Sequence, residues 1–454
     1  MMLPNTSTST DTLLLVASLA LVISTGPGWA QDVSVENGVR FPDGTVQMTS
    51  ARPTPTTVRE TGMKACFDDL GVEVACAGTG HDGDGRPGME WSAGRRFVQF
   101  GTGIVIDTLT GLMWLRDAGC IASSTWEDAF AAVTSFNGGA EFGCLEYTAG
   151  SFDDWRVPSV TELVSLIDYG DTFAVPAGHP FVALAVGNCS IWTSTTQINL
   201  QGDRDRAWGA RLGSAIAPHL LQGQIKSNPN NCVLPVRTQV GAPPPDDAVL
   251  ALTGGGITFG DGSLQSSAPL PGFLLIPETG QTDCFSDSGI PIQCAGSGQD
   301  GETQNGVPWP DPRLVDNGDG TVKDELTGLT WLKDAECLGE FVQWEEALGK
   351  LDDLSTGTDF SCIDYTPGSF DDWRLPTITE QLSLFDFGSD TGLPSGHPFD
   401  FSDITLCQVF WSSTTLVTDA EFAWRLRVGP KATTGFDVNA TDKAGNGCVW
   451  PVRE

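Results

Sequence analysis

The stretch Gly150-Ser-Phe-Asp-Asp-Trp-Arg-Val-Pro158 returns later in the chain, with one substitution, as Gly368-Ser-Phe-Asp-Asp-Trp-Arg-Leu-Pro376. Further landmarks recur in the same order on both sides of it. They pair Thr110–Leu115 with Thr327–Leu332, Gly178–Phe181 with Gly396–Phe399, Trp192–Thr196 with Trp411–Thr415, and Cys232–Arg237 with Cys448–Arg453. Ordered matches over this length indicate two tandem copies of one module.

The duplication sets the expected domain boundaries. The chain has 454 residues, of which 40% are hydrophobic, so it can bury more than one core. We expect a signal peptide (1–30), a leader hairpin with a small cysteine loop (31–96), copy 1 (97–238), a Pro-rich linker (239–247), a second leader and cysteine loop (248–313), and copy 2 (314–454).

The 12 cysteines divide evenly between the copies. An even number in an exported chain is typical of a disulfide framework. Six cysteines allow many connectivities, and we favour sequential pairs because both copies must close their bridges in the same way. The expected pairs are Cys66–Cys76, Cys120–Cys144 and Cys189–Cys232 in copy 1, and Cys284–Cys294, Cys337–Cys362 and Cys407–Cys448 in copy 2.

The N-terminal 30 residues resemble a signal peptide. An apolar run, Leu13–Ile23, leads to Gly28-Trp29-Ala30, where small residues suit cleavage after Ala30. The start is atypical because Asp11, and no Lys or Arg, precedes the run. A membrane anchor is the alternative, but the run is short for a bilayer, and we expect no membrane span elsewhere. The expected location is secreted, periplasmic or on the cell surface.

The chain is strongly acidic. Lys and Arg total 24 against 58 Asp and Glu, which gives a formal charge of −34. This field repels nucleic acids and other polyanions, so we expect no nucleic-acid partner.

Local patterns predict a mixture of helices and strands. Ser159-x-x-Glu162 and Thr377-x-x-Glu380 are capping boxes before apolar residues, which predicts a helix in each copy. Second helices are expected over Trp126–Phe136 and Trp344–Leu351. Short strands are expected over Val105–Trp114, Ile191–Thr195, Ala207–Leu212 and Cys232–Arg237. This mixture of helices and strands is typical of an α+β fold.

These motifs resemble a known family. Thr-Gly-Leu-x-Trp-Leu, Asp-Asp-Trp-Arg-(Val/Leu)-Pro-x-x-x-Glu, Trp-(Thr/Ser)-Ser-Thr-Thr and a closing Val-x-Pro-Val-Arg are similar to the Lcl C-terminal domain family, named for a bacterial collagen-like adhesin and long a domain of unknown function. The resemblance covers about residues 97–238 and 314–453. It implies two tandem C-type-lectin-like domains, because the Trp-Arg-Leu-Pro-x-x-x-Glu element is similar to one in such folds, including the formylglycine-generating enzymes. The closing segment departs from the family, since its cysteine, Cys232, stands earlier than usual.

The leader segments Val39–Ala51 and Ile257–Ala268 resemble Asp-Gly turn units of fibrous tail and stalk proteins. Such units pack around trimer axes, so the resemblance implies a homo-oligomer. A simple β-hairpin explains the same pattern.

Acidic and histidine motifs are the candidate sites of chemistry. Asp82–Gly85 and Asp316–Gly320 look like calcium loops but lack the alternating donors of an EF-hand, so glycine turns are preferred. His179 and His397 are too isolated for a metal cluster. The pair Asp153-Asp154, repeated in copy 2, could be imagined as acid and base, but the neighbouring Trp-Arg favours a structural ion pair.

The 14 tryptophans allow two interpretations, since aromatic platforms bind sugars but matched aromatics are more often core. Six recur at matched places: Trp91, Trp114, Trp126, Trp155, Trp192 and Trp208.

The leading hypothesis is a non-enzymatic secreted or surface binding protein, without metal or cofactor, that recognises a glycan or a surface protein. The alternatives are an oxidase of the formylglycine-generating type, which needs a reactive thiolate, and a structural part of a surface appendage.

Overall fold

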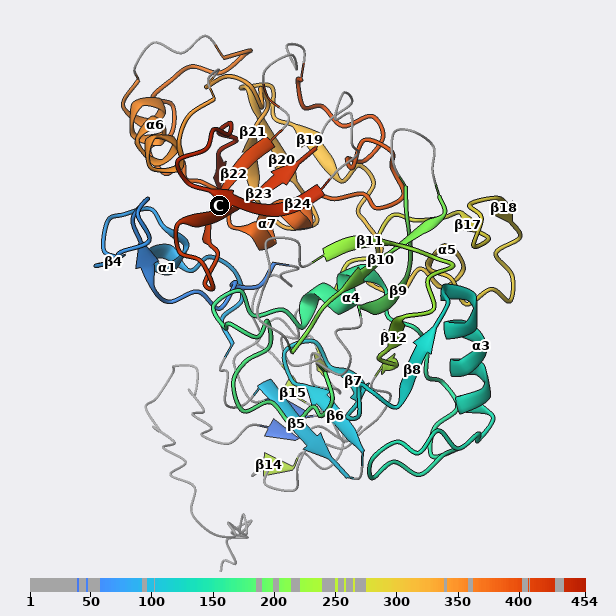
Figure 1. Ribbon diagram of the computed structural model, residues 1–454. Coiled ribbons are helices and arrows are strands. Elements are labelled where there is room, and N and C mark those ends of the chain that lie inside the picture. The colour runs from blue at the N-terminus through green and yellow to red at the C-terminus, as the bar shows by residue number, and fades with distance from the viewer. Residues whose placement is uncertain are drawn as a thin grey trace, which may run out of the picture. The chain divides into compact units, whose positions relative to one another are not determined.

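The computed structural model describes residues 39–40, 46–47, 58–91, 96–101, 103–184, 190–198, 204–213, 221–238, 250–251, 257–258, 264–265, 275–338, 341–357, 362–401, 407, 409–428 and 437–454. The chain divides into two compact units (Figure 1). One consists of Met1–Thr54 and Val240–Gly272, and the other of Pro55–Gln239 and Phe273–Glu454. The expected signal peptide and the Pro-rich linker lie outside the described residues.

The smaller unit contains the strands of both leader segments. Strands β1 (Val39–Arg40) and β2 (Val46–Gln47) are antiparallel, and β14 (Leu250–Ala251) pairs in parallel with β1. A second antiparallel pair joins β15 (Ile257–Thr258) to β16 (Leu264–Gln265). Each leader therefore contains the expected hairpin pairing, and the two leaders belong to the same unit.

Copy 1 is built on two sheets. The first has the order β13-β7-β6-β5 and the second β11-β10-β9-β12-β8. Helices α3 (Trp126–Asn137) and α4 (Val160–Ser165) complete the copy. The strands are β5 (Phe97–Phe100), β6 (Ile104–Asp107), β7 (Leu112–Leu115), β8 (Ile121–Ser124), β9 (Ile191–Gln197), β10 (Arg206–Ala210), β11 (Leu221–Ile225), β12 (Asn231–Val233) and β13 (Val236–Thr238).

Copy 2 repeats the first sheet of copy 1 and three strands of the second, while the equivalents of β12 and β8 form only isolated bridges, Phe410 with Cys448 and Val342 with Gly447. Its sheets are β19-β20-β21-β25 and β22-β23-β24, and its helices are α6 (Trp344–Thr356) and α7 (Ile378–Ser383). The strands are β19 (Leu314–Asp316), β20 (Thr321–Asp324), β21 (Thr330–Leu332), β22 (Val409–Thr415), β23 (Phe422–Arg427), β24 (Asp437–Asp442) and β25 (Val452–Arg453). The protein is therefore a β-rich mixed α/β protein with two domain-sized segments.

Both capping boxes are present. The Ser159 and Thr377 side chains accept from the backbone N–H of Glu162 and Glu380, and those carboxylates accept from the cap N–H. Each box satisfies two backbone donors that a helix start leaves free, so α4 and α7 begin where the sequence predicted.

Two expected strands are each divided. The segment Val105–Trp114 is a hairpin, because Gly111 at φ 72° turns the chain between β6 and β7. The segment Cys232–Arg237 breaks at Leu234-Pro235, since proline has no N–H for a ladder. As a result, β12 joins the sheet of β9 while β13 pairs with β7.

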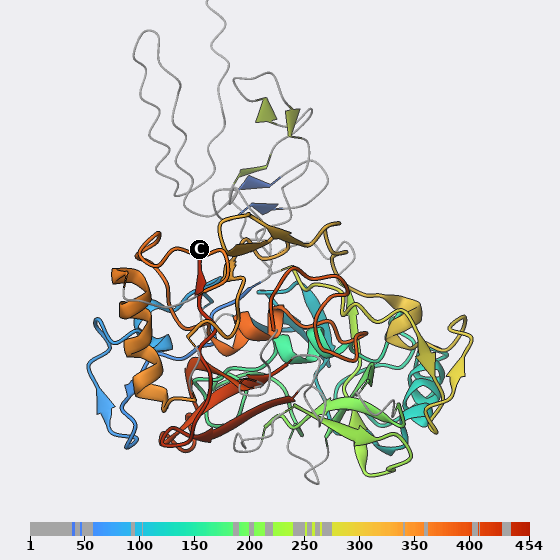
Figure 2. The same ribbon diagram turned by 90° about the horizontal axis from the view of Figure 1, so that it is seen from above.

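Two small cysteine loops precede the copies. The first Cys loop (residues 58–91) contains β3 (Cys66–Phe67), β4 (Glu73–Val74) and the helical turn α1 (Asp82–Gly85). The second Cys loop (residues 275–309) contains β17 (Cys284–Phe285), β18 (Pro291–Ile292) and α5 (Asp300–Thr303). Both views place the first Cys loop beside α6 of copy 2 and the second beside α3 of copy 1 (Figures 1 and 2).

Five disulfides have the expected sequential pairing: Cys66–Cys76, Cys120–Cys144, Cys284–Cys294, Cys337–Cys362 and Cys407–Cys448. Cys232 is also disulfide-bonded, and its expected partner, Cys189, lies outside the described residues.

The core is rich in tryptophan. Matched indoles donate to matched backbone carbonyls, as from Trp126 to Thr193 and from Trp344 to Ser412, both at 2.7 Å. Among the described residues only Trp309 is more than slightly exposed, and the remaining tryptophans are buried. The core interpretation of the matched tryptophans is therefore confirmed.

Candidate functional site

Each Cys loop contacts the copy that follows it in the sequence and also contacts the other copy. In the first Cys loop, the Thr61 carbonyl accepts from the Tyr169 N–H of copy 1, at 2.9 Å. In the same loop, 21 residues further on, Asp82 accepts from the Thr414 hydroxyl of copy 2, at 2.7 Å. The second Cys loop does the reverse, because Asp300 accepts from Thr195 of copy 1 at 2.5 Å. Both copies and both loops therefore meet in one reciprocal interface.

The two aspartates occupy equivalent positions in this interface. Asp82 also accepts from Thr61 at 2.7 Å, and Asp300 accepts from Thr279 at 2.7 Å. Both side chains are buried, and burial raises the pKa of each carboxyl to about 6. In both groups the second carboxyl oxygen, Oδ1, has no hydrogen-bond partner. Each aspartate is therefore held between a threonine of its own loop and a threonine of the other copy.

Two buried lysines form the second contact of the interface. The Lys443 ammonium lies 4.0 Å from the Trp344 ring centroid and donates to the Phe67 and Asp68 carbonyls of the first Cys loop, at 2.8 and 3.0 Å. Its side chain is fully buried, and burial lowers its pKa to about 8. The ammonium thereby fixes the base of the first Cys loop against copy 2.

Lys226 of copy 1 makes the equivalent contact with the second Cys loop. It lies 3.9 Å from the Trp126 ring centroid and donates to the Phe285 and Ser286 carbonyls, at 3.4 and 3.2 Å. Burial lowers its pKa to about 7, against the opposing effect of nearby carboxylates on Asp287, Glu127 and Asp205.

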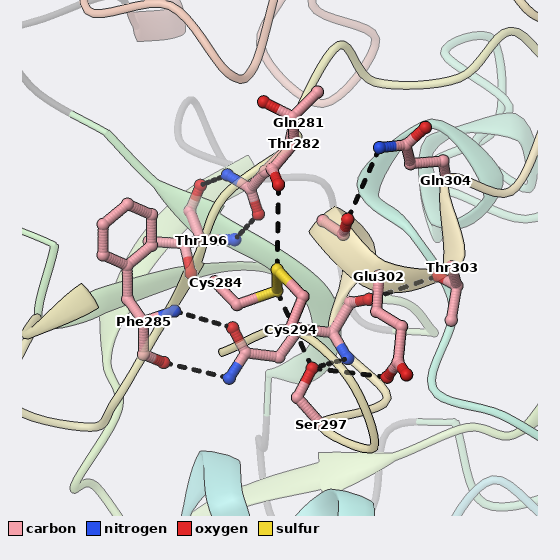
Figure 3. The surroundings of a disulfide bond; sticks show 12 residues. Thr196, Gln281, Thr282, Cys284, Phe285, Cys294, Ser297, Glu302, Thr303 and Gln304 are labelled. Atoms are coloured by element: carbon pink, nitrogen blue, oxygen red, sulfur yellow. Dashed lines mark hydrogen bonds between the residues drawn. A yellow bond between two sulfur atoms is a disulfide. The ribbon is translucent and has the colours of Figure 1, made fainter. Parts of the chain in front are cut away.

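The surroundings of the Cys284–Cys294 disulfide show how the second loop is anchored (Figure 3). Gln281 accepts from the Thr196 N–H of copy 1 at 2.8 Å and donates to the Thr196 carbonyl at 3.0 Å. On the loop itself, Gln299 makes the same kind of two-way bond with the Phe285 backbone, at 2.9 and 3.0 Å. The Gln281 side-chain amide thus pairs with the Thr196 backbone as a neighbouring strand would, and it links the sheet of copy 1 to the second Cys loop.

Aromatic contacts also cross between the copies. Tyr169 of copy 1 packs edge-on against Trp424 of copy 2, and Phe387 of copy 2 packs against Trp208 of copy 1. A cavity of about 70 Å³ is lined by residues of both copies and both Cys loops, among them Val58, Val164, Ile276 and Leu382. This volume accommodates a few water molecules and is far below that of a pocket for a drug-sized ligand.

The repeated acidic motif is part of the scaffold. Asp154 forms two bonds with Arg237 of β13, at 2.6 and 3.0 Å, and Asp372 repeats them with Arg453. The expectation that the adjacent arginine holds the aspartate is wrong. That arginine, Arg156, pairs instead with the capping-box carboxylate Glu162. The closing strand reaches the motif only through the tertiary fold, so no local pattern predicts this partner.

The two glycine-rich acidic stretches are turns. Asp82–Gly85 forms α1, whose Asp82 is committed to the interface. Asp316 accepts from the Gly318 N–H at 2.8 Å and is paired with Lys333 at 2.8 Å. Within the described part of the chain, no three His, Cys, Asp or Glu side chains are grouped so as to hold a metal ion.

The matched histidines lie in tight turns. The backbone N–H groups of His179 and His397 bond to Pro176 and Pro394, and their rings rest on Phe181 and Phe399. The cysteines that the structure describes include no free thiol. No helix among the described residues is long and apolar enough to cross a membrane.

No motif in the sequence identifies the residues that join the copies, namely Asp82, Asp300, Lys226 and Lys443. One signal was present: in a chain with only 24 Lys and Arg, both lysines stand shortly before the last cysteine of their copy. Their partners lie 59 to 376 residues away, so no local pattern could have identified them.

Fold and site define a disulfide-stapled, duplicated protein whose copies are joined by exchanged loops. The family model described as the Lcl C-terminal domain matches residues 103–237 and 320–453. These matches cover more than half of the chain, which therefore belongs to the Lcl C-terminal domain family in two tandem copies. No curated protein and no solved structure matches it.

Proposed function

We propose that this chain is a non-enzymatic binding or adhesion protein that acts outside the cytoplasm, in which two C-type-lectin-like copies form one rigid bivalent body. The observation that carries this proposal is that the repeated polar motifs stabilise the fold in both copies. In each copy Asp-Asp-Trp-Arg holds the closing strand and the capping box, and the described cysteines are in disulfides. Polar groups and cysteines that are already paired within the fold support a structural role rather than a catalytic one.

An extracytoplasmic location agrees with the disulfides, which persist in oxidising compartments. Membership of a family named for an adhesin supports the binding role by analogy. Among the residues that the structure describes, the tryptophans other than Trp309 are buried and do not offer platforms for sugar stacking, so a protein ligand is favoured over a glycan.

The test is a binding screen with the purified full chain on a panel of surface proteins and on a glycan array. Saturable binding of a defined ligand is expected, and protein ligands should predominate. The oxidase alternative is tested in parallel by titrating free thiols in the native protein. A reactive thiol, or the absence of any ligand on either panel, would overturn the proposal.

A further inference from the structure

We propose that the exposed aliphatic side chains on the hairpins of the two Cys loops are docking knobs for a partner protein that presents apolar sockets within a basic surface. Knob 1 is Leu70 with Val72, and knob 2 is Ile290 with Ile292. This inference rests on the proposed binding function and identifies its surface and its class of partner.

The knobs are among the most exposed large apolar side chains that the structure describes. Leu70 and Val72 are 72% and 57% exposed, and Ile290 and Ile292 are 62% and 42% exposed. Val72 and Ile290 occupy the same position, six residues after the first cysteine of their loop. Leu70 and Ile292 are not equivalent, because Leu70 corresponds to Ser288 and Ile292 lies on β18 opposite Cys284. Single exposed apolar residues need no explanation, but two exposed aliphatic side chains on each hairpin indicate a recognition surface.

Each knob is held rigidly before any partner arrives. A disulfide closes the hairpin at its base. In knob 1 the Asp68 carboxylate accepts from the N–H groups of Leu70 and Val72, at 3.0 and 2.8 Å. In knob 2 the Ser286 hydroxyl accepts from the Ile290 N–H at 3.2 Å. A prearranged tip loses little conformational entropy on binding, which favours affinity.

Acidic residues flank both knobs in the sequence, Asp68, Asp69 and Glu73 at knob 1 and Asp287 at knob 2. Beside knob 1, burial and the carboxylates of Asp69 and Asp68 raise the pKa of Glu345 of copy 2, against the opposing effect of Lys443. Beside knob 2, burial and the carboxylates of Glu127 and Asp128 raise the pKa of Asp287, against the opposing effect of Lys226. At each knob the carboxylates outnumber the lysine that they face, and the chain carries a net charge of −34, so the complementary surface is basic.

The same charges argue against a lipid surface. An anionic membrane would be repelled by these clusters and by the net charge of −34. A basic protein surface satisfies both features, since lysine and arginine side chains reach the carboxylates while apolar sockets receive the aliphatic tips.

The experiment measures binding of the full chain to three immobilised peptides, one of alternating lysine and leucine, one of lysine and serine, and one of glutamate and leucine. Vesicles containing phosphatidylserine form a fourth arm. The variants are Leu70→Ser/Val72→Ser for knob 1, Ile290→Ser/Ile292→Ser for knob 2, and all four together. Phe173→Ser is the matched control, because Phe173 is 55% exposed and lies in neither Cys loop.

The lysine–leucine peptide should bind most tightly, with two equivalents per chain. Each single-knob variant should lose one equivalent, and the fourfold variant should weaken binding about tenfold or more, while Phe173→Ser changes nothing. Equal binding of wild type and fourfold variant, or preference for vesicles or for the glutamate–leucine peptide, would overturn the inference. A fourfold variant that retains a ligand found in the screen would overturn the knobs but leave the proposed binding function standing.

Discussion

At the scale of single residues, Asp82 and Asp300 predict how stability depends on pH. Folding raises the pKa of each carboxyl from 3.8 to about 6, because burial disfavours the ionised form. The folded state therefore binds protons more tightly than the unfolded state, and the free energy of unfolding should rise as pH falls from about 6 towards 4. Each carboxyl contributes at most about 3 kcal/mol to this rise.

Urea denaturation at several pH values between about 7 and 4 measures the effect. The double variant Asp82→Asn/Asp300→Asn should show a flatter dependence, though not a flat one. Burial also raises the pKa of Asp168 and Asp386 to about 6, and both groups remain. A double variant with the same dependence as wild type would show that the two interface carboxyls do not titrate as described.

The second prediction at the scale of single residues concerns the contribution of Lys443 to stability. Replacing it by methionine keeps much of the packing on Trp344 but leaves the Phe67 and Asp68 carbonyls without their donor. Lys443→Met should therefore lower the free energy of unfolding by about 1–3 kcal/mol. Lys64→Met, at an exposed position, is the control and should stay within about 0.5 kcal/mol of wild type. Chemical denaturation of both variants at pH 7 makes the comparison.

At the scale of elements, the disulfide of each Cys loop should stabilise the protein by restricting the unfolded chain. The cysteines of both bridges are 10 residues apart in sequence. A loop of this length predicts a loss of about 2–3 kcal/mol for Cys66→Ala/Cys76→Ala. The matched pair Cys284→Ala/Cys294→Ala should lose a similar amount. A loss in one loop only would mean that the two loops do not have equivalent structural roles.

The elements themselves were partly predictable. Helices α4 and α7 begin at capping boxes that the sequence displays, because a cap is a contact among residues three positions apart. Helix α6 extends past the expected end at Leu351 to Thr356, where the chain turns at Gly357 with φ 86°. The division of Cys232–Arg237 between two sheets was not predicted, because strand pairing depends on partners far away in sequence.

At the scale of the whole molecule, the crossing loops predict that the halves stay together without a covalent link. Protease sites placed before Pro55 and on both sides of residues 240–272 would release the smaller unit and leave Pro55–Gln239 and Phe273–Glu454 as separate chains. These chains should co-elute in gel filtration under native conditions, because Asp82, Asp300 and both lysines join them.

Adding the substitutions Lys226→Met and Lys443→Met to the cleavable protein should weaken this association. The uncut double variant serves as the control for folding. Separation of the wild-type halves after cleavage, without denaturant, would contradict the reciprocal interface.

The division of the leader segments also belongs to this scale. The sequence grouped each leader hairpin with its cysteine loop, as 31–96 and 248–313. In the structure the boundary falls within these segments, after Thr54 and after Gly272. The leader strands pair with each other, whereas the Cys loops pack on the two copies.

The sequence by itself determined the duplication, the family and the capped helices, since each depends on repeated motifs or on residues close in the chain. The sequential disulfide pairing was a hypothesis from the sequence, which the structure confirms for the five described bridges. The tertiary structure decided the rest. Asp154 meets Arg237, Thr414 meets Asp82, and the lysines meet the opposite loops across separations of 59 to 376 residues. Such contacts leave no local pattern, because their geometry exists only after the two copies have packed together.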